Sequence, residues 1–240
     1  MDNLMHTLRR RKLPRKSLHD GFSLIEVAIV LIILALLLGS LLPALSIQVE
    51  QSERKKAHET LDQAREALIG FAMTNGRLIC PDCRDNTGLC VSVTANDGQE
   101  DRVNTPKVCS TAVGNLPWVD LGVPERDPWD SRYTYQVTTA FADDVPPSTS
   151  FTLANDGDIT VQDAAGGPVA QNIPAIIISH GSNGKILPPT SAQEIENTDG
   201  DTIYVLKIYS RDPILEFDDL VTWISPSVLR NRMVVSGQLP

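Results

Sequence analysis

The stretch DGFSLIEVAIVLIILALLLGSLLPALS, residues 20–46, determines how the rest of the chain is organised. The 21 residues from Val27 to Ile47 carry no charge. A helix of that length rises roughly 30 Å, which matches the hydrocarbon core of a bilayer. Glu26 lies at the edge of this apolar run. A carboxylate in a membrane helix costs on the order of 2–3 kcal/mol at the centre and less near an end. We therefore expect Glu26 to have a partner and a role.

Charge is unevenly divided along the 240-residue chain. From Phe22 onward, 15 Lys and Arg stand against 28 Asp and Glu, a net charge of −13. The residues before Phe22 are basic, as is typical of the cytoplasmic flank of a membrane segment, so the C-terminal part is expected across the membrane. The acidic remainder would repel phosphates, which argues against nucleic-acid binding. The basic residues of the N-terminal segment are Arg9, Arg10, Arg11, Lys12, Arg15 and Lys16.

Two ordinary explanations of the apolar run, a secretory signal peptide and a generic membrane anchor, each leave one of its features unexplained. A secretory signal peptide has an apolar core of about 7–15 residues, which this run exceeds, and no convincing small-x-small cleavage site follows it. A generic single-pass anchor fits the length but leaves Glu26 unexplained.

The residues from Gly21 to Glu26, GFSLIE, resemble the prepilin signature. This signature occurs in type IV pilins and in the pseudopilins of type II secretion systems. The resemblance implies that a membrane aspartyl prepilin peptidase removes the basic leader, residues 1–21, by cutting between Gly21 and Phe22. It also implies methylation of the new N-terminus at Phe22. The leader is long, and Asp20 stands where the family often has a basic residue.

The resemblance implies that Glu26 acts in assembly rather than in catalysis. Cleavage creates an α-ammonium group at Phe22, and Glu26 can pair with that group on its own chain or on a neighbouring one. In a low dielectric such pairing favours one axial register between packed helices. Pro43 removes a helical hydrogen bond and is expected to bend the helix, as pilins often do at the corresponding place. A tolerated transmembrane proline is the alternative.

The helical pattern continues beyond the apolar run but becomes amphipathic. Apolar residues recur at spacings of three and four, and Asn75-Gly76 is a suitable end. The sequence thus predicts one helix over 22–75, roughly 80 Å long, with a transmembrane part at about 27–47. Its second half is expected to pack on a globular domain, 76–240. A coiled coil is the alternative, although the apolar stripe lasts only about two heptads. The stripe consists of Leu61, Ala64, Leu68 and Phe71.

All four cysteines, Cys80, Cys83, Cys90 and Cys109, lie in a turn-rich loop, 77–110. An even number in an exported domain favours disulfides. Zinc is disfavoured because only one half of the spacing resembles a zinc ribbon. Thiol redox chemistry is disfavoured because the C-x-x-C lacks the strand and helix context that lowers a thiol pKa. Three pairings exist; we favour Cys80–Cys109 with Cys83–Cys90 nested inside, because this pairing closes the ends of the loop.

The fold class predicted for the remainder is α+β, with the long helix packed on an antiparallel sheet, as in pilins. The stretch 127–135, DPWDSRYTY, resembles the entry to the first strand of major pseudopilins, with Asp130 in place of a glycine. Trp118 and Trp129 are expected to anchor the core. Strands are expected at 133–139, 150–153, 159–161, 175–179 and 202–209. A helical turn at 217–225 and a short helix at 226–235 are expected to follow.

No catalytic residue, cofactor or metal site is predicted. Residues 178–184 resemble the "SxGxdG" loop of pseudopilins rather than a nucleophile elbow, and His180 is interpreted as a turn residue. The acidic loop 194–201 could ligate calcium, as a comparable loop does in some major pseudopilins, with Asp199 and Asp201 as first ligands. Its spacing does not match an EF-hand, and a solvated turn is the favoured interpretation.

The sequence therefore predicts a structural filament subunit, a pilin or pseudopilin, anchored once in the inner membrane with a periplasmic or extracellular domain. A domain of roughly 165 residues favours a minor subunit. The implied partners are the prepilin peptidase, other pilin subunits and an inner-membrane assembly platform. A separate ATPase is needed because the chain has no P-loop. The alternatives are a membrane-anchored periplasmic ligand-binding or thiol-redox protein and an adhesive pilin at a filament tip. Pilus and secretion pseudopilus stay equally open.

Overall fold

The computed structural model describes residues 23–85, 88–104, 107–144, 151–185, 189, 191–212 and 215–239. For residues 40–45 and 91–92 it describes the backbone only. The predicted leader, with the Gly21–Phe22 cleavage site, lies outside the described residues. The chain divides into two compact units, residues 1–48 and 49–240, which are described separately below.

In the first unit, all the described residues after Ser23 belong to one helix, α1 (Leu24–Asn75), which continues into the second unit. The helical backbone continues through Pro43, whose side chain is not described, so a bend at this residue stays a prediction. The helix ends at Asn75, and Gly76 follows with φ +76°, a left-handed conformation that glycine adopts without strain.

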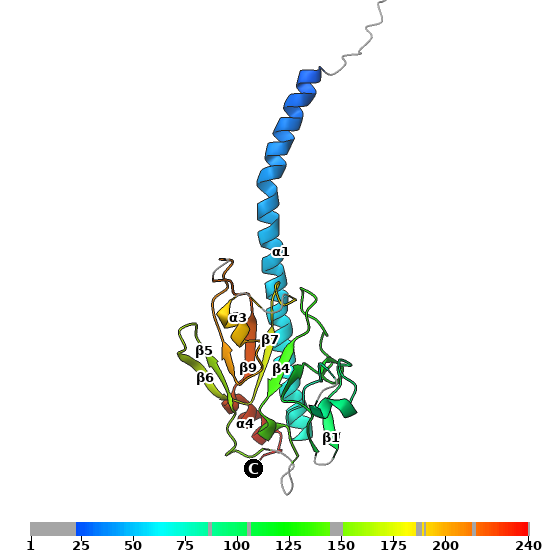
Figure 1. Cartoon of the computed structure of the whole chain (residues 1–240), viewed down its shortest axis with the longest axis vertical. Helices are drawn as coiled ribbons and strands as arrows, with labels where there is room; N and C mark the ends of the chain where they lie inside the picture. The colour runs from blue at the N-terminus through cyan, green and yellow to red at the C-terminus, as the bar shows by residue number, and fades with distance from the viewer. Residues whose placement is uncertain are drawn as a thin grey trace, which may run out of the picture. The chain divides into compact units, whose positions relative to one another are not determined.

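The second unit is built around a four-stranded antiparallel sheet with the order β3-β4-β7-β9. These strands are β3 (Val113–Asn115), β4 (Thr134–Val137), β7 (Ala175–Ser179) and β9 (Leu220–Ile224). Figure 1 shows β4, β7 and β9 side by side, with the part of α1 that belongs to this unit next to them. The buried stripe of α1 packs on this sheet in the main core, and it comprises Ala57, Leu61, Ala64, Leu68, Ile69 and Ala72.

The central strand β7 is buried on both faces. Ala175 and Ile177 belong to the core shared with α1, whereas Ile176 and Ile178 belong to a second apolar cluster. Alternate residues of a strand point to opposite faces, so β7 joins a helix layer on one side to a second sheet on the other.

The second sheet has the order β6-β5-β8 and covers the other face of β7. It contains β5 (Ile159–Gln162), β6 (Pro168–Ile173) and β8 (Ile203–Val205). The four-stranded sheet is antiparallel, as predicted, whereas β5 pairs with β8 in parallel, which was not expected. The reason is topological: the chain passes through β6 and β7 before it returns beside β5 in the same direction.

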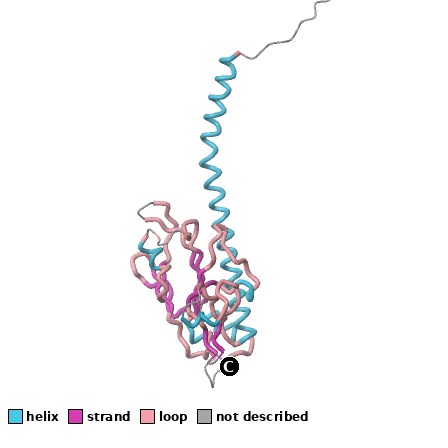
Figure 2. The backbone as a smooth tube through the Cα atoms, turned by 45° about the vertical axis from the view of Figure 1, so that its right-hand side comes forward, coloured by secondary structure: helices cyan, strands magenta, loops and turns pink. Residues whose placement is uncertain are grey.

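Short elements and loops complete the second unit, as Figure 2 shows. The hairpin β1 (Arg102–Asn104) and β2 (Lys107–Cys109) lies in the cysteine-rich region. The helices are α2 (Trp118–Leu121), α3 (Ala192–Glu196) and α4 (Pro226–Val235), with 3₁₀ turns at Gly88–Ser92 and Thr139–Phe141.

The predicted strands at 159–161 and 175–179 and the predicted helix at 226–235 are confirmed. The predicted strands at 133–139 and 202–209 are real but shorter, at Thr134–Val137 and Ile203–Val205.

Two predictions of local structure are wrong. The described part of 150–153 is not a strand, because Asn155 Oδ1 accepts hydrogen bonds from the backbone and hydroxyl of Thr152 and holds a turn. The predicted helical turn at 217–225 contains strand β9 instead. β9 pairs with β7 over five residues, and this long-range ladder outweighs the local helical tendency.

The two tryptophans differ in their surroundings. Trp129 packs partly buried against the main core, as predicted. Trp118 is half-buried and, among the described residues, belongs to neither core cluster. Its ring lies 4.9 Å from the Arg132 guanidinium carbon and closely covers Gly98. A cation–π contact, not core burial, therefore holds Trp118.

Candidate functional site

The N-terminal part of α1 presents an apolar surface that is interrupted by one charged residue, Glu26. Side chains from Leu24 to Leu38 point in all directions around the helix, and Leu24 is 92% exposed and Leu38 60% exposed. A helix that is apolar on every side must be covered by lipid or by other helices.

Glu26 lies in the first turn of this helix. The backbone N–H groups of Glu26 and Val27 both donate to the Ser23 carbonyl, at 3.0 and 3.2 Å, so the helix begins here. The positive end of the helix dipole favours a carboxylate at such a position. Phe22, the predicted partner of Glu26, lies outside the described residues, so the pairing stays a prediction.

Within the described part of the chain, no helix is identified as both long and apolar enough to cross a membrane.

The cysteines form the bridges Cys80–Cys109 and Cys83–Cys90, with Cα–Cα distances of 5.3 and 6.0 Å. This is the nested pairing favoured above. Because all four cysteines of the chain are in these bridges, none offers the free thiolate that zinc binding or redox chemistry requires.

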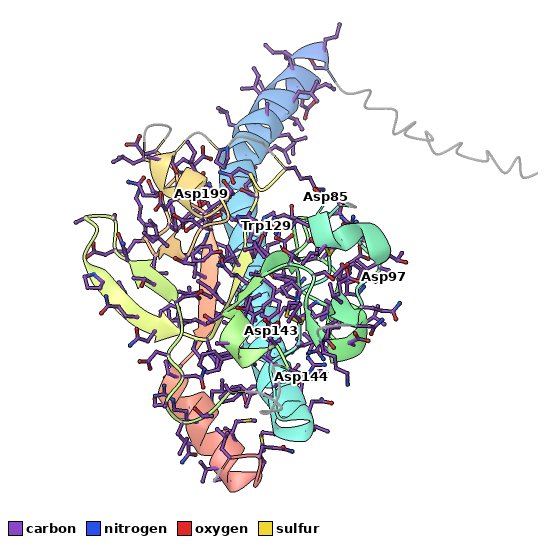
Figure 3. The ribbon with its side chains drawn as sticks, turned by 60° about the horizontal axis from the view of Figure 1, so that its bottom comes forward. Asp85, Asp97, Trp129, Asp143, Asp144 and Asp199 are labelled. Atoms are coloured by element: carbon purple, nitrogen blue, oxygen red, sulfur yellow. A yellow bond between two sulfur atoms is a disulfide. The ribbon has the colours of Figure 1, made fainter. Side chains whose placement is uncertain are left out.

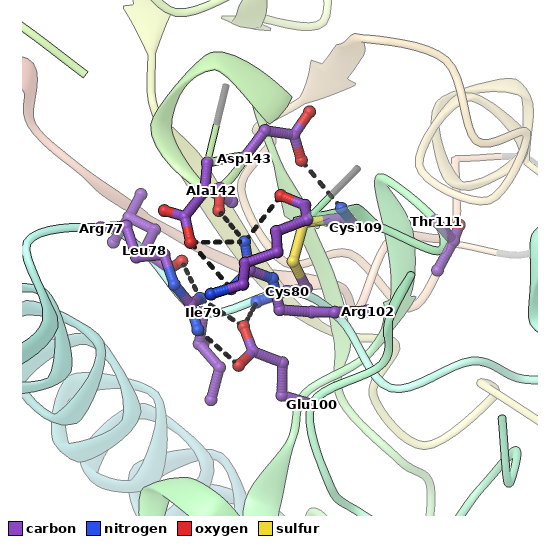
Figure 4. The surroundings of a disulfide bond; sticks show 12 residues. Arg77, Leu78, Ile79, Cys80, Glu100, Arg102, Cys109, Thr111, Ala142 and Asp143 are labelled. Atoms are coloured by element: carbon purple, nitrogen blue, oxygen red, sulfur yellow. Dashed lines mark hydrogen bonds and ion pairs between the residues drawn. A yellow bond between two sulfur atoms is a disulfide. The ribbon is translucent and has the colours of Figure 1, made fainter. Parts of the chain in front are cut away.

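Carboxylates fix the backbone around the first bridge, as Figure 4 shows. The Cys80 N–H donates to Glu100 at 2.7 Å, and Glu100 is also paired with Arg77. The Cys109 N–H donates to Asp143 at 2.8 Å. The bridge therefore lies in a hydrogen-bonded frame, which is typical of a structural disulfide.

The turn at 127–131 is held by Asp127 rather than by Pro128 alone. Asp127 Oδ1 accepts from the backbone of Trp129 and Ser131 at 3.0 and 2.8 Å, and Oδ2 accepts from the Ser179 hydroxyl at 2.7 Å. These bonds fasten the turn to the end of β7. Asp130 has φ +66°, a left-handed conformation. This geometry explains why glycine suits that position in the resembled family.

A buried cluster of three carboxylates, Glu194, Asp218 and Asp219, was missed by sequence reasoning. These residues are 1%, 3% and 4% exposed, and one oxygen of each lies within 4.8 Å of the others. Glu194 lies in the first turn of α3, where the hydroxyl of the N-cap residue Ser191 accepts from the Glu194 N–H. The Asp-Asp pair immediately precedes β9. The sequence placed Glu194 in the acidic loop 194–201, but it gave no sign that the Asp-Asp pair, assigned to the wrong element, lies beside it.

Neutral donors satisfy most oxygens of the cluster. Asp218 Oδ2 accepts from the backbone and hydroxyl of Ser182, at 2.7 and 2.6 Å, and Asp219 Oδ2 accepts from Asn197 at 2.7 Å. Glu194 accepts from the Asp218 N–H at 3.0 Å and from Asn183 at 3.1 Å. In contrast, Asp218 Oδ1 is buried and has no hydrogen-bond partner among the described residues.

The electrostatics of this cluster are unfavourable without a counter-charge. Burial is the main reason that the pKa of Glu194 and of Asp218 is raised. The negative charge of Asp219 raises both pKa values further, by a smaller amount. His180 Nδ1 lies 3.4 Å from Asp219 Oδ1, and Arg54 donates at 3.5 Å to the Asp218 carbonyl. Buried carboxylates of this kind require protons or a cation. Three carboxylates with one unpartnered oxygen fit a hard cation such as calcium, which prefers oxygen ligands.

The rest of the loop named from the sequence contains a second cluster, Glu196, Asp199 and Asp201, in which both aspartates are exposed. Asp199 Oδ1 accepts from the Asp201 N–H at 3.1 Å, and Asp201 Oδ1 accepts from the Ile203 N–H at 2.6 Å. Asp199 lies on the surface near α3, as Figure 3 shows. These two aspartates hold a solvated turn, and the buried cluster is the better cation site.

Comparison with known proteins agrees with the N-terminal analysis. Residues 16–42 match the family model of the prokaryotic N-terminal methylation motif. This range includes Gly21, Phe22 and Glu26. The motif is consistent with a type IV pilin-like family. No curated protein and no solved structure matches the chain.

Proposed function

We propose that this chain is a structural subunit of a filament of the type IV pilin kind, in a surface pilus or a secretion pseudopilus. The prepilin is inserted once in the inner membrane, through about residues 27–47, with its N-terminus in the cytoplasm and its large domain in the periplasm. A prepilin peptidase cuts between Gly21 and Phe22, and Phe22 is methylated. The mature helix then leaves the bilayer and packs among the helices of other subunits.

The observation that carries this proposal is the exposed apolar surface of α1 from Leu24 to Leu38, with one carboxylate, Glu26, in its first turn. Lipid covers such a surface before assembly and neighbouring helices cover it afterwards. The methylation motif over 16–42 supports the same role. An α+β unit with a helix packed on a sheet is compatible with a pilin-like fold.

The partners follow from this role: the prepilin peptidase, other pilin subunits and an inner-membrane platform driven by a separate ATPase. The size of the second unit favours a minor subunit. Since the disulfides leave no free thiol, the thiol-redox alternative has less support than a ligand-binding one.

Processing and assembly can be tested separately. We expect mass spectrometry of the mature chain to find a methylated Phe22 at the N-terminus. A Glu26→Ala subunit should be cleaved normally but should enter filaments at least tenfold less often than wild type, because it lacks the carboxylate that sets the helix register. Glu66→Ala is the matched control, since Glu66 is an exposed glutamate in the second unit. Normal incorporation of Glu26→Ala, or an uncleaved N-terminus, would contradict the proposal.

We also propose that the second unit contains a structural calcium site. Glu194, Asp218 and Asp219 would hold the ion, and Asp218 Oδ1 has no hydrogen-bond partner among the described residues. The ion would supply the positive charge that these buried carboxylates lack. It would thereby join α3 to the residues that precede β9.

A further inference from the structure

A cavity of about 410 Å³ lies at one end of the four-stranded sheet. The register places the end of β3, the start of β4 and the end of β7 together, because Asn115 faces Thr134 and Thr134 faces Ile178. β9 begins at the same end, where Ser179 pairs with Leu220. Loops leaving these strands form the wall, as is usual for sites built on a rigid sheet. The volume lies within the range of small-molecule sites, roughly 300–1,000 Å³.

The charge of the cavity wall is opposite to that of its surroundings. Residues 49–240 contain 27 Asp and Glu against 15 Lys and Arg. Cations nevertheless outnumber carboxylates in the wall: Arg84, Arg126, Arg132 and Lys185 line it, against Asp130 and Asp219. A locally positive cavity in an acidic domain favours an anion.

Three of these cations are neutralised within the protein. Lys185 Nζ lies 2.8 Å from Asp130, and Arg126 is also paired with Asp130, at 3.6 Å. Arg132 donates to Glu125 at 3.0 Å. These ion pairs offset the positive charges of Lys185, Arg126 and Arg132 at the rim of the cavity.

Arg84 differs from the other three cations. Its Nη2 donates to two neutral oxygens, the Gly114 carbonyl at 3.2 Å and the Thr134 hydroxyl, and no carboxylate pairs with it among the described residues. Arg84 is exposed, so a ligand can reach it. A guanidinium held in this way has further N–H groups for a planar oxyanion, which arginine binds in bidentate geometry.

Two further polar groups, Ser131 and His180, lie in the cavity wall. Ser131 is 9% exposed, and its hydroxyl has no partner among the described residues, so it is available as a donor. His180 Nε2 is 2.7 Å from the Thr134 hydroxyl, while its Nδ1 faces Asp219. His180 therefore helps to position the Thr134 hydroxyl, which Arg84 also contacts.

We propose that this cavity binds a small organic anion through a carboxylate or phosphate group, with Arg84 as the anchoring cation. A cationic ligand is disfavoured by Arg84, and a purely apolar ligand is disfavoured by the charged wall. This inference goes beyond the filament role and does not depend on it.

The test is calorimetric titration of the full mature chain in detergent micelles. Sodium phosphate and sodium succinate are the probes, at constant ionic strength set with sodium chloride. We expect saturable binding of at least one probe, and the probe that binds identifies the head group. Arg84→Gln should weaken it at least tenfold. Lys185→Gln should weaken it about threefold, because Asp130 at the rim then loses the cation that offsets its negative charge. Arg230→Gln should bind within twofold of wild type, since Arg230 pairs with Asp156 and does not line the cavity.

Circular dichroism and disulfide mapping establish whether each variant is folded. If Arg84→Gln does not fold, the affinity of Lys185→Gln is used to test the proposal. The proposal is overturned if neither anion binds the wild-type chain above the chloride background. It is also overturned if the pocket variants bind as wild type does, or if Arg230→Gln loses affinity equally, which would indicate a general charge effect.

Discussion

Individual residues in this protein are constrained by what lies a few ångströms away. Gly181 follows β7 with φ +61°, and a Cβ placed there would lie 2.4 Å from the Asp218 carboxyl carbon. The backbone thus approaches the buried carboxylates as closely as glycine allows. The sequence placed Gly181 in the loop 178–184 but could not identify its neighbour, since Asp218 is distant in the chain.

At this scale we predict that Gly181→Ala destabilises the second unit by at least about 3 kcal/mol, from left-handed strain together with the steric clash. Gly200→Ala is the matched control: Gly200 has φ +81°, but a Cβ added to it would meet nothing within 4 Å among the described residues. It should cost only about 1–2 kcal/mol. Urea unfolding followed by circular dichroism measures both. Equal losses would mean that the close approach to Asp218 is unimportant.

At the scale of elements, the two disulfides constrain loops of very different length. Cys80–Cys109 has a sequence separation of 29 and lies in the main core, whereas Cys83–Cys90 has a separation of 7. Chain entropy makes the longer loop more valuable, because closing it removes more freedom from the unfolded chain.

We therefore predict a larger loss from the Cys80→Ala/Cys109→Ala pair, about 3–4 kcal/mol, than from the Cys83→Ala/Cys90→Ala pair, about 2 kcal/mol. Thermal unfolding of the two double variants provides the comparison. Each variant retains the other bridge, so each controls for general cysteine loss. The reverse order of stability would refute the assignment of Cys80–Cys109 as the main structural bridge.

At the scale of the whole molecule, three carboxylates of this acidic chain, Glu194, Asp218 and Asp219, lie together in one buried cluster. Burial raises the pKa of Glu194 and Asp218, so the folded unit binds their protons more tightly than the unfolded chain does. Their contribution to stability is present at low pH and is lost as pH rises from the ordinary carboxylate pKa through the raised values. A bound cation would replace the lost protons at neutral pH.

We predict that millimolar calcium raises the unfolding temperature of the full chain at pH 7 by several degrees relative to a chelator, and that this gain shrinks toward pH 4. Asp218→Asn should abolish most of the calcium-dependent gain. Asp199→Asn should retain it, because Asp199 is exposed and belongs to the second cluster. A gain that depends on Asp199 and not on Asp218 would move the site to the surface loop.

Elements that depend on interactions between neighbouring residues could be predicted from the sequence, whereas elements that depend on pairing between distant segments could not. Helix α1, its end at Asn75 and the strand β7 follow from local periodicity and composition, which act within a few residues. The segment at 217–225 was misassigned because its structure depends on the ladder with β7. The parallel pairing of β5 with β8 likewise depends on how distant segments return.

By itself, the sequence determined the long apolar helix with Glu26, the methylation motif, the disulfide-bearing loop and the α+β class. Each of these features follows from contiguous residues or from short spacings between residues along the chain. Only the tertiary structure decided that Glu194, Asp218 and Asp219 share one buried cluster, and that Arg84 and His180 line one cavity. Glu194 comes from α3 and the others from loops, and strand pairing between distant segments brings them together.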